Sequence, residues 1–144
     1  MILQDVKNKK VSDLMSRNIL VGHQSNSFTH TLRLFSEMTF HHLPIVNSDQ
    51  ELVGIISSND MLKSLTLKLP MLKNTKDDTL NQALDIKELM TPNPVVISPQ
   101  SNIEEVLNAF SHYHIHALPV VENNKIVGII TSNDVLAELN NKNK

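Results

Sequence analysis

The clearest feature of the hydrophobic pattern is a pair of short apolar runs joined by a polar turn. Residues 43–46 and 52–56 are such runs, and Asn47-Ser48-Asp49-Gln50 lies between them. Apolar runs of about four to eight residues, bounded by turn residues, are typical of buried strands. The same pattern returns from residue 118, with Glu122-Asn123-Asn124 as its turn. The pattern therefore predicts two β-hairpins in corresponding parts of the chain.

A helix is predicted before each hairpin. Ile103, Val106, Leu107 and Phe110 stand at positions i, i+3, i+4 and i+7, and residues 28–35 keep a similar spacing. This spacing places apolar side chains along one face of a helix. Both segments are therefore expected to cover one face of a small sheet.

Shorter signals complete each copy. Ile19-Leu20-Val21 and Val95-Val96-Ile97 are apolar and are interpreted as buried first strands. Closing helices are predicted to begin near Ser58 and Ser132. Each copy then has the order β-α-β-β-α.

The chain contains an internal repeat. Residues 11–62 match residues 86–136 at an offset of 75, which falls to 74 after the turn, with roughly 19 identical positions. The strongest match is VGIISSND at 53–60, which returns as VGIITSND at 127–134. A unit of about 50 residues buries too little surface to be stable alone. We therefore predict an α+β fold, in which two tandem β-α-β-β-α repeats pack around a pseudo-twofold axis.

The repeat suggests a division of the chain. Residues 1–68 are assigned to the first repeat with an N-terminal segment, 69–79 to an exposed linker, and 80–144 to the second repeat with a leading helix. The apolar spacing of residues 80–89 predicts that helix, and Asp77-Asp78-Thr79 is typical of a helix start.

Composition excludes several classes of function. There is no cysteine, so disulfides and thiol chemistry are excluded. A net charge of -2 and an aromatic content of 3% argue against nucleic acid as a partner. No apolar run approaches the length of about 18 residues that a membrane helix needs, and residues 1–5 lack the pattern of a signal peptide. A cytoplasmic protein without a membrane partner is expected.

Two polar turns carry the candidate chemistry. Residues 57–60 and 131–134 each follow an apolar strand and open a helix. Unpaired N–H groups and the helix dipole favour an anion at such a point. The Asp60 and Asp134 carboxylates can accept hydrogen bonds from vicinal hydroxyl groups. A hydroxyl residue followed three positions later by an acid is equally typical of a plain helix cap, so both readings stay open.

Metal and enzyme chemistry are weaker hypotheses. His112, His114 and His116 alternate, which would place them on one side of a strand for a metal ion, but no carboxylate stands nearby as a further ligand. Neither a nucleophile elbow nor a phosphate-binding glycine loop is present. We therefore expect neither an enzyme nor an obligatory cofactor, and a metal-responsive module is kept as an alternative.

The order of these motifs resembles the CBS domain, and two in tandem resemble a Bateman module. The resemblance extends from about Val11 to Leu139. It implies a regulatory module that binds an adenine nucleotide or another adenosyl ligand (AMP, ADP, ATP or S-adenosylmethionine) in the clefts between the repeats. It also implies a signal to an effector protein, whose identity is unknown, and a homodimer formed through helices. A structural or interaction module that binds no ligand is the alternative.

The resemblance assigns two composite sites, each with the acidic turn of one repeat and apolar or histidine residues of the other. Site A comprises Ser57, Asn59, Asp60, Thr91, Val95, Val96, Ile115, His116 and Pro119. Site B comprises Thr131, Asn133, Asp134, Ser16, Leu20, Val21, Phe40, His41 and Pro44.

Overall fold

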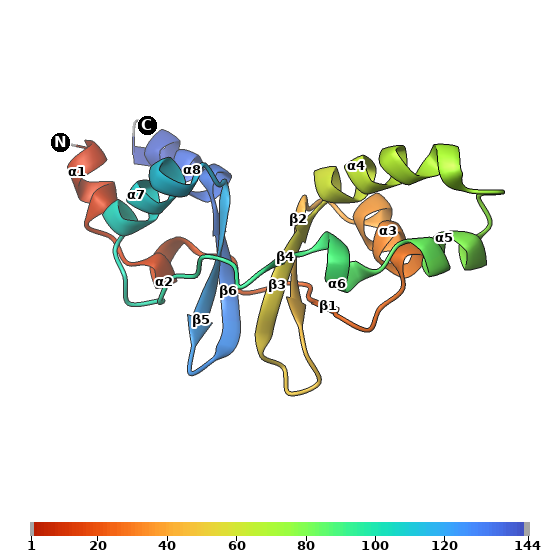
Figure 1. Cartoon of the computed structure of the whole chain (residues 1–144). Coiled ribbons are helices and arrows are strands. Elements are labelled where there is room, and N and C mark those ends of the chain that lie inside the picture. The colour runs from red at the N-terminus through yellow and green to blue at the C-terminus, as the bar shows by residue number, and fades with distance from the viewer. Residues whose placement is uncertain (1, 143–144) are drawn as a thin grey trace. The chain divides into compact units, whose positions relative to one another are not determined.

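The computed structural model describes residues 2–142, which form two compact units (Figure 1). Unit 1 contains the described residues up to Ile19 and those from Val95 onward, and unit 2 contains Leu20–Pro94. Each unit has one hairpin with helices on one side of it. No helix within residues 2–142 is long and apolar enough to cross a membrane.

Unit 2 is built on a four-stranded sheet with the order β1-β2-β3-β4. β2 (His42–Val46) and β3 (Leu52–Ser57) are the antiparallel hairpin, while β1 (Gly22–His23) lies parallel to β2 and β4 (Thr91–Pro92) lies antiparallel to β3. The helical elements are α3 (Phe28–Glu37), α4 (Ser58–Lys68), the 3-10 turn η1 (Leu69–Met71), α5 (Asp77–Ala83) and α6 (Ile86–Leu89). Phe28, Leu43, Ile45, Ile56 and Ile86 are almost completely buried in its core.

Unit 1 repeats this plan with isolated bridges in place of the outer strands. Its hairpin is β5 (Ala117–Glu122) with β6 (Lys125–Thr131). Ile97 forms a parallel bridge with Val120, and Ser16 forms an antiparallel bridge with Ile129. The helices are α1 (Ile2–Lys7), α2 (Val11–Leu14), α7 (Ile103–Tyr113) and α8 (Ser132–Lys142), and the core includes Val6, Val11, Ile103, Val106, Leu118 and Ile130.

The α+β fold of tandem repeats, the two hairpins, and the helices before and after them are confirmed. The polar turns close the hairpins through local geometry. Asn47 Oδ1 accepts the N–H groups of Asp49 and Glu51 at 2.9 and 3.0 Å. Asn123 and Asn124 both have positive φ angles, 53° and 65°. Asn tolerates this left-handed conformation, and two-residue hairpin turns require it.

The expected first strands are shifted and shorter than predicted, since β1 is Gly22–His23 and only Ile97 of residues 95–97 forms a bridge. Residues 19–21 and 95–97 form no strand of their own, and the ladders begin only at Gly22 and Ile97. The physical reason is that both segments leave one unit and enter the other at these points. A segment that changes sheets cannot form a continuous ladder with either one.

The expected leading helix begins as predicted at Asp77, but it is divided into α5 and α6. Leu84 and Asp85 interrupt it with extended backbone, and the Asp85 side chain accepts the Lys87 N–H at 3.1 Å, which starts the next helix. The apolar spacing continues across the break because Leu84 and Ile86 are both buried in the core of unit 2.

The compact units differ from the division expected at residues 68 and 80. The segment before Ile19 packs with the second repeat, where α1 contacts α7 and α8. The segment 69–94 packs with the first repeat, where α5 contacts α3. Thus each repeat completes its core with the segment that precedes the other one. Helix α1 was not predicted, although it stands 75 residues before α5.

Candidate functional site

The first acidic turn joins β3 to α4 through two reciprocal hydrogen bonds. The Ser57 N–H donates to Asp60 Oδ2 at 2.9 Å, and the Asp60 N–H donates to Ser57 Oγ at 3.1 Å. This arrangement is a capping box, which stabilises a helix start. The Ser58 N–H donates to the carbonyl oxygen of His41 at 3.0 Å. The turn is therefore tied to the residue that precedes β2, the strand paired with β3.

The second turn has the same geometry and one additional bond. The Thr131 N–H donates to Asp134 Oδ2 at 2.8 Å, and the Thr131 hydroxyl donates to the same oxygen at 3.1 Å. The Asp134 N–H donates to Thr131 Oγ1 at 3.3 Å, and the Ser132 N–H donates to the carbonyl oxygen of His116 at 2.9 Å. The cap geometry expected from the sequence is thus present at both turns.

The caps leave part of each carboxylate available. Asp60 and Asp134 use Oδ2 for the cap, and Oδ1 of neither residue has a hydrogen bond among the described residues. Both residues are half-buried, whereas Asn59 and Asn133 are exposed. A fixed carboxylate oxygen at the start of a helix can accept a hydrogen bond from a ligand hydroxyl group, while helix N–H groups nearby favour an anion. One aspartate can therefore cap its helix through Oδ2 and bind a ligand hydroxyl group through Oδ1.

A segment with a second hydroxyl residue runs beside each turn. Thr91 pairs with Ile55 in unit 2, and Ser16 pairs with Ile129 in unit 1. The Ser16 pairing has hydrogen bonds of 2.9 and 3.0 Å. Each partner lies two residues before its turn. The structure therefore places Thr91 near the Ser57 turn and Ser16 near the Thr131 turn, while their role in a ligand site stays a prediction.

Glycine makes this approach possible. A Cβ at Gly54 would overlap the Met90 sulfur and stand 3.0 Å from the carbonyl oxygen of Thr91. A Cβ at Gly128 would stand 2.8 Å from both the Met15 sulfur and the carbonyl oxygen of Ser16. The two glycines recur in the repeat, but sequence reasoning missed the recurring methionines that lie against them. The recurrence of Leu-Met 75 residues apart was the available signal.

The other predicted site residues belong to the unit that does not hold their assigned turn. Within their units, Pro44 and Pro119 are buried in β2 and β5, and Phe40 packs on Phe35 with ring centroids 5.1 Å apart. Site A residues found in unit 1 are Val95, Val96, Ile115, His116 and Pro119, and site B residues found in unit 2 are Leu20, Val21, Phe40, His41 and Pro44.

The backbone of each histidine contacts the turn of its own repeat. His41 accepts the Ser58 N–H, and His116 accepts the Ser132 N–H. The resemblance assigns each of these histidines to the opposite turn. Both side chains are exposed. The assignment across repeats stays a prediction.

The alternating histidines do not share one side of a strand. His112 is in the last turn of α7, His114 has left-handed backbone with φ of 55°, and His116 precedes β5. His112 instead packs edge-on against Tyr113, with centroids 4.6 Å apart. Within the described part of the chain, no three metal-ligating side chains gather. The helix end and the turn separate the rings, so the geometry expected for a metal site is not found.

The fold and the paired turns define a class: a tandem α+β module with two strand-to-helix turns, each carrying an acidic cap. The CBS domain family model matches residues 11–67 and 86–141, and the chain belongs to the CBS domain family. The two matches make it a CBS domain pair.

Curated relatives align over most of this chain but only part of their own. A homoserine O-acetyltransferase from Methanohalobium evestigatum is 32% identical over 87% of this chain and 23% of its own length. An L-aspartate semialdehyde sulfurtransferase from Methanocaldococcus jannaschii is 31% identical over 87% of this chain and 22% of its own length. The chain therefore spans less than a quarter of these two relatives.

Solved structures show the same fold. The CBS domain pair of protein MJ0100, in complex with 5'-methylthioadenosine and S-adenosyl-L-methionine, has a TM-score of 0.77 and 28% identity. The comparison covers 95% of this chain and 99% of that one. CBSX2 in complex with AMP has a TM-score of 0.78 and 25% identity, covering 95% of this chain and all of that one.

Proposed function

We propose that this chain is a regulatory, non-enzymatic module that binds an adenosyl ligand, with AMP, ADP, ATP and S-adenosylmethionine as the candidates. The observation that carries the proposal is the duplicated acidic turn. In both copies the aspartate is fixed by its cap through one oxygen while the other has no partner in the described chain. Ribose offers two vicinal hydroxyl donors for such an acceptor.

The two structural relatives support the ligand class. One was solved with AMP and the other with 5'-methylthioadenosine and S-adenosyl-L-methionine. These molecules share adenosine and differ in charge at the 5' position. We infer that the aspartate turn recognises the shared ribose, and that the first helical N–H groups donate hydrogen bonds to a phosphate where one is present.

We propose further that each site is composite, as the family resemblance of the sequence implies. Site A would combine Asp60 with Thr91 and the other assigned residues of the second repeat, and site B would combine Asp134 with Ser16 and the other assigned residues of the first. A ligand that contacts both repeats favours one arrangement over another, by no more than its difference in affinity for the two. This coupling would carry the signal to an effector protein in the cytoplasm, where adenosyl metabolites are found.

A homodimer formed through helices is part of the proposal. Leu62 on α4 and Leu136 on α8 occupy equivalent positions and are 56% and 60% exposed. Val106 on α7 is fully buried in unit 1, so it is not available for such a contact. The exposed leucines therefore mark the helix surfaces that we expect to meet a second copy.

The test is thermal unfolding of the chain with AMP, ADP, ATP, S-adenosylmethionine and NAD. A ligand at about 100 times its dissociation constant adds about 2.7 kcal/mol to the free energy of unfolding. Asp60→Asn and Asp134→Asn retain one oxygen for the cap but replace the other with an amide nitrogen, which cannot accept a hydrogen bond. Asp78→Asn, at an exposed position in the first turn of α5, is the matched control.

We expect stabilisation by at least one adenosyl compound, reduced by one or both cap-retaining variants and unchanged in the control. Loss of a charge-assisted hydrogen bond costs about 1.5–3 kcal/mol, so affinity should fall roughly tenfold or more. If no adenosyl compound stabilises the chain, the proposal fails, and the alternative of an interaction module without ligand takes its place.

A further inference from the structure

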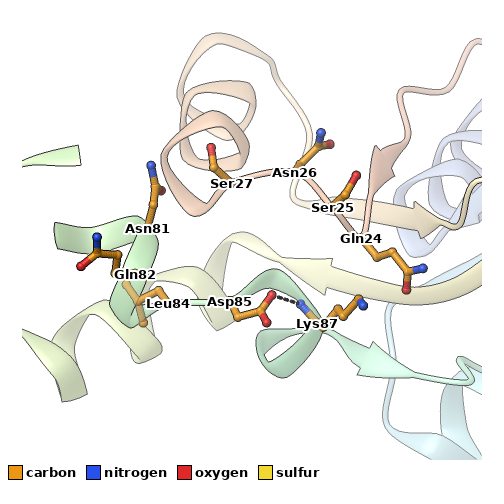
Figure 2. Close-up of a pocket in the computed structure, with 9 residues that line it drawn as sticks. All are labelled: Gln24, Ser25, Asn26, Ser27, Asn81, Gln82, Leu84, Asp85 and Lys87. Atoms are coloured by element: carbon orange, nitrogen blue, oxygen red, sulfur yellow. Dashed lines mark hydrogen bonds between the residues drawn. The ribbon is translucent and has the colours of Figure 1, made fainter. Parts of the chain in front are cut away.

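A polar groove lies in unit 2, and no residue of either acidic turn lines it. Its upper wall in Figure 2 is the loop Gln24–Ser27, which joins β1 to α3, and its lower wall is the segment Asn81–Lys87 across the α5–α6 break. The groove has a volume of about 400 Å³. This lies within the range of about 300–1,000 Å³ that is usual for small-molecule sites.

The two walls are joined at one end by a pair of side-chain bonds. Asn81 Oδ1 accepts the Thr29 N–H at 2.9 Å, and Asn81 Nδ2 donates to Thr29 Oγ1 at 3.0 Å. Ser27 and Asp85 form an antiparallel bridge further along. These contacts hold the α5–α6 connection against the start of α3, so the walls are preformed.

At the equivalent place in unit 1, hydrogen bonds join the two segments. The Val11 N–H donates to the carbonyl oxygen of Ser101 at 2.8 Å, and the Ser12 N–H donates to the carbonyl oxygen of Pro99 at 3.0 Å. Lys10 Nζ then bonds Gln100 Oε1 at 3.1 Å across the two segments.

In unit 2 the sequence differs at these same positions. Asp85 stands where unit 1 has Lys10, Lys87 where it has Ser12, and Ser25 where it has Gln100. Both units have a backbone bridge here, Lys10 with Asn102 in unit 1 and Ser27 with Asp85 in unit 2. The Ser12–Pro99 bond has no counterpart, because the Lys87 N–H donates to Asp85 Oδ1 at 3.1 Å instead. Among the described residues, unit 2 therefore lacks the Ser12–Pro99 and Lys10–Gln100 contacts that join the two segments in unit 1.

Several polar side chains of the groove in unit 2 form no hydrogen bond with the rest of the described chain. Asp85 Oδ1 accepts the Lys87 N–H, but Asp85 Oδ2 and Lys87 Nζ have no hydrogen bond among the described residues. The side chains of Gln24 and Gln82 are similarly without partners there. The groove thus offers one carboxylate, one ammonium group and neutral amides, and no aromatic ring lines it.

We propose that this groove binds a small zwitterion, a free α-amino acid. The ligand ammonium would face the Asp85 carboxylate and the ligand carboxylate would face the Lys87 ammonium, while the amides hydrogen-bond polar atoms of its side chain. A base or a nicotinamide ring is disfavoured because the groove has no surface on which to stack it. The inference is independent of adenosyl binding at the acidic turns.

The test is a heteronuclear NMR titration of the ¹⁵N-labelled chain with glycine, L-aspartate, L-lysine, L-methionine and L-glutamine. Each is added up to about 10 mM, which covers the weak end of specific binding. Acetate and methylammonium each present half of the zwitterion, and sorbitol tests a neutral polyol. We expect saturable shifts in residues 24–27 and 85–87 with at least one amino acid and with none of these three controls.

Three test variants and one control variant make the titration decisive. Asp85→Asn keeps the oxygen that caps α6, and Lys87→Met keeps the side-chain length; each should weaken binding roughly tenfold or more. The double variant Asp85→Lys with Ser25→Gln copies the Lys10–Gln100 pair of unit 1 and should abolish binding in a folded chain. Glu88→Gln, an exposed neighbour on α6, should bind as the wild type does.

The proposal is overturned if no amino acid gives saturable shifts, or if acetate, methylammonium or sorbitol gives the same ones. It is equally overturned if Asp85→Asn and Lys87→Met bind unchanged. An adenosyl titration of the same sample reports on the acidic turns separately, so failure of one proposal does not imply failure of the other.

Discussion

Alanine at the two repeat-related glycines should destabilise the chain for different physical reasons. At Gly54 the main obstacles are two atoms of the flexible Met90 side chain, the sulfur and Cγ at 2.9 Å, and the Thr91 carbonyl oxygen at 3.0 Å is only a tight contact. At Gly128 the added methyl group would meet backbone, the Ser16 carbonyl oxygen at 2.8 Å, in addition to the Met15 sulfur. A side chain can rotate away, whereas the backbone is held by the Ser16–Ile129 hydrogen bonds.

Overpacking of this kind costs about 1–3 kcal/mol. We expect Gly54→Ala near the lower end of that range and Gly128→Ala near the upper end. For a chain of 144 residues, 1 kcal/mol corresponds to about 3 °C in melting temperature. Urea unfolding of both variants measures the free energies directly.

Second-site variants separate the two causes. Met90→Ala removes the atom that obstructs Gly54→Ala, so the double variant should be more stable than the sum of the single losses predicts. Met15→Ala leaves the Ser16 oxygen in place, so it should relieve Gly128→Ala much less. The explanation is refuted if the two methionine variants recover the same amount of stability. It is also refuted if Gly128→Ala alone does not lower the free energy of unfolding.

Three further predictions concern contacts elsewhere in the two units. Replacing Leu62 and Leu136 together by Glu should convert a dimer into a monomer in light scattering without unfolding it; a wild-type monomer would contradict the dimer. The hydrogen bond to Glu138 raises the pKa of Lys9 above its ordinary value of 10.5. The stability that this contact adds should therefore be complete below pH 10.5 and lost as the pH rises through the higher pKa of the folded state. Urea denaturation of the wild type and of Lys9→Met at a series of pH values measures this loss. If both chains lose the same stability as the pH rises, the Lys9–Glu138 contact does not contribute. Asn81→Ala removes both bonds to the start of α3 and should cost about 1–3 kcal/mol in urea unfolding; a loss below about 0.5 kcal/mol would count against that contact.

The repeat allowed much of the fold to be predicted. The hairpins and the helices α3, α4, α7 and α8 each have a complete local pattern, because one apolar face and one turn determine them. The exchange of segments between units was not predictable in this way. Val11 and Ile86 have similar local sequences, and nothing nearby in the chain specifies that each packs with the other repeat.

The candidate site was predicted in part for a related reason. The capped aspartates and their neighbours Ser16 and Thr91 follow from the repeat and the family resemblance. The glycine–methionine contacts depend on backbones that approach from distant parts of the chain. The groove beside Asp85 is still harder to predict. It depends on unit 2 lacking the Ser12–Pro99 and Lys10–Gln100 hydrogen bonds of unit 1.

The most direct test of the central claim is a calorimetric titration of the wild-type chain with AMP and with S-adenosylmethionine, repeated on the double variant Asp60→Asn, Asp134→Asn. The account predicts saturable binding of at least one of these ligands to the wild type and a loss of roughly tenfold or more in affinity in the double variant, which keeps its helix caps. Undiminished binding in that variant would show that the duplicated turns do not hold the ligand, and absence of binding to the wild type would contradict the proposed function itself.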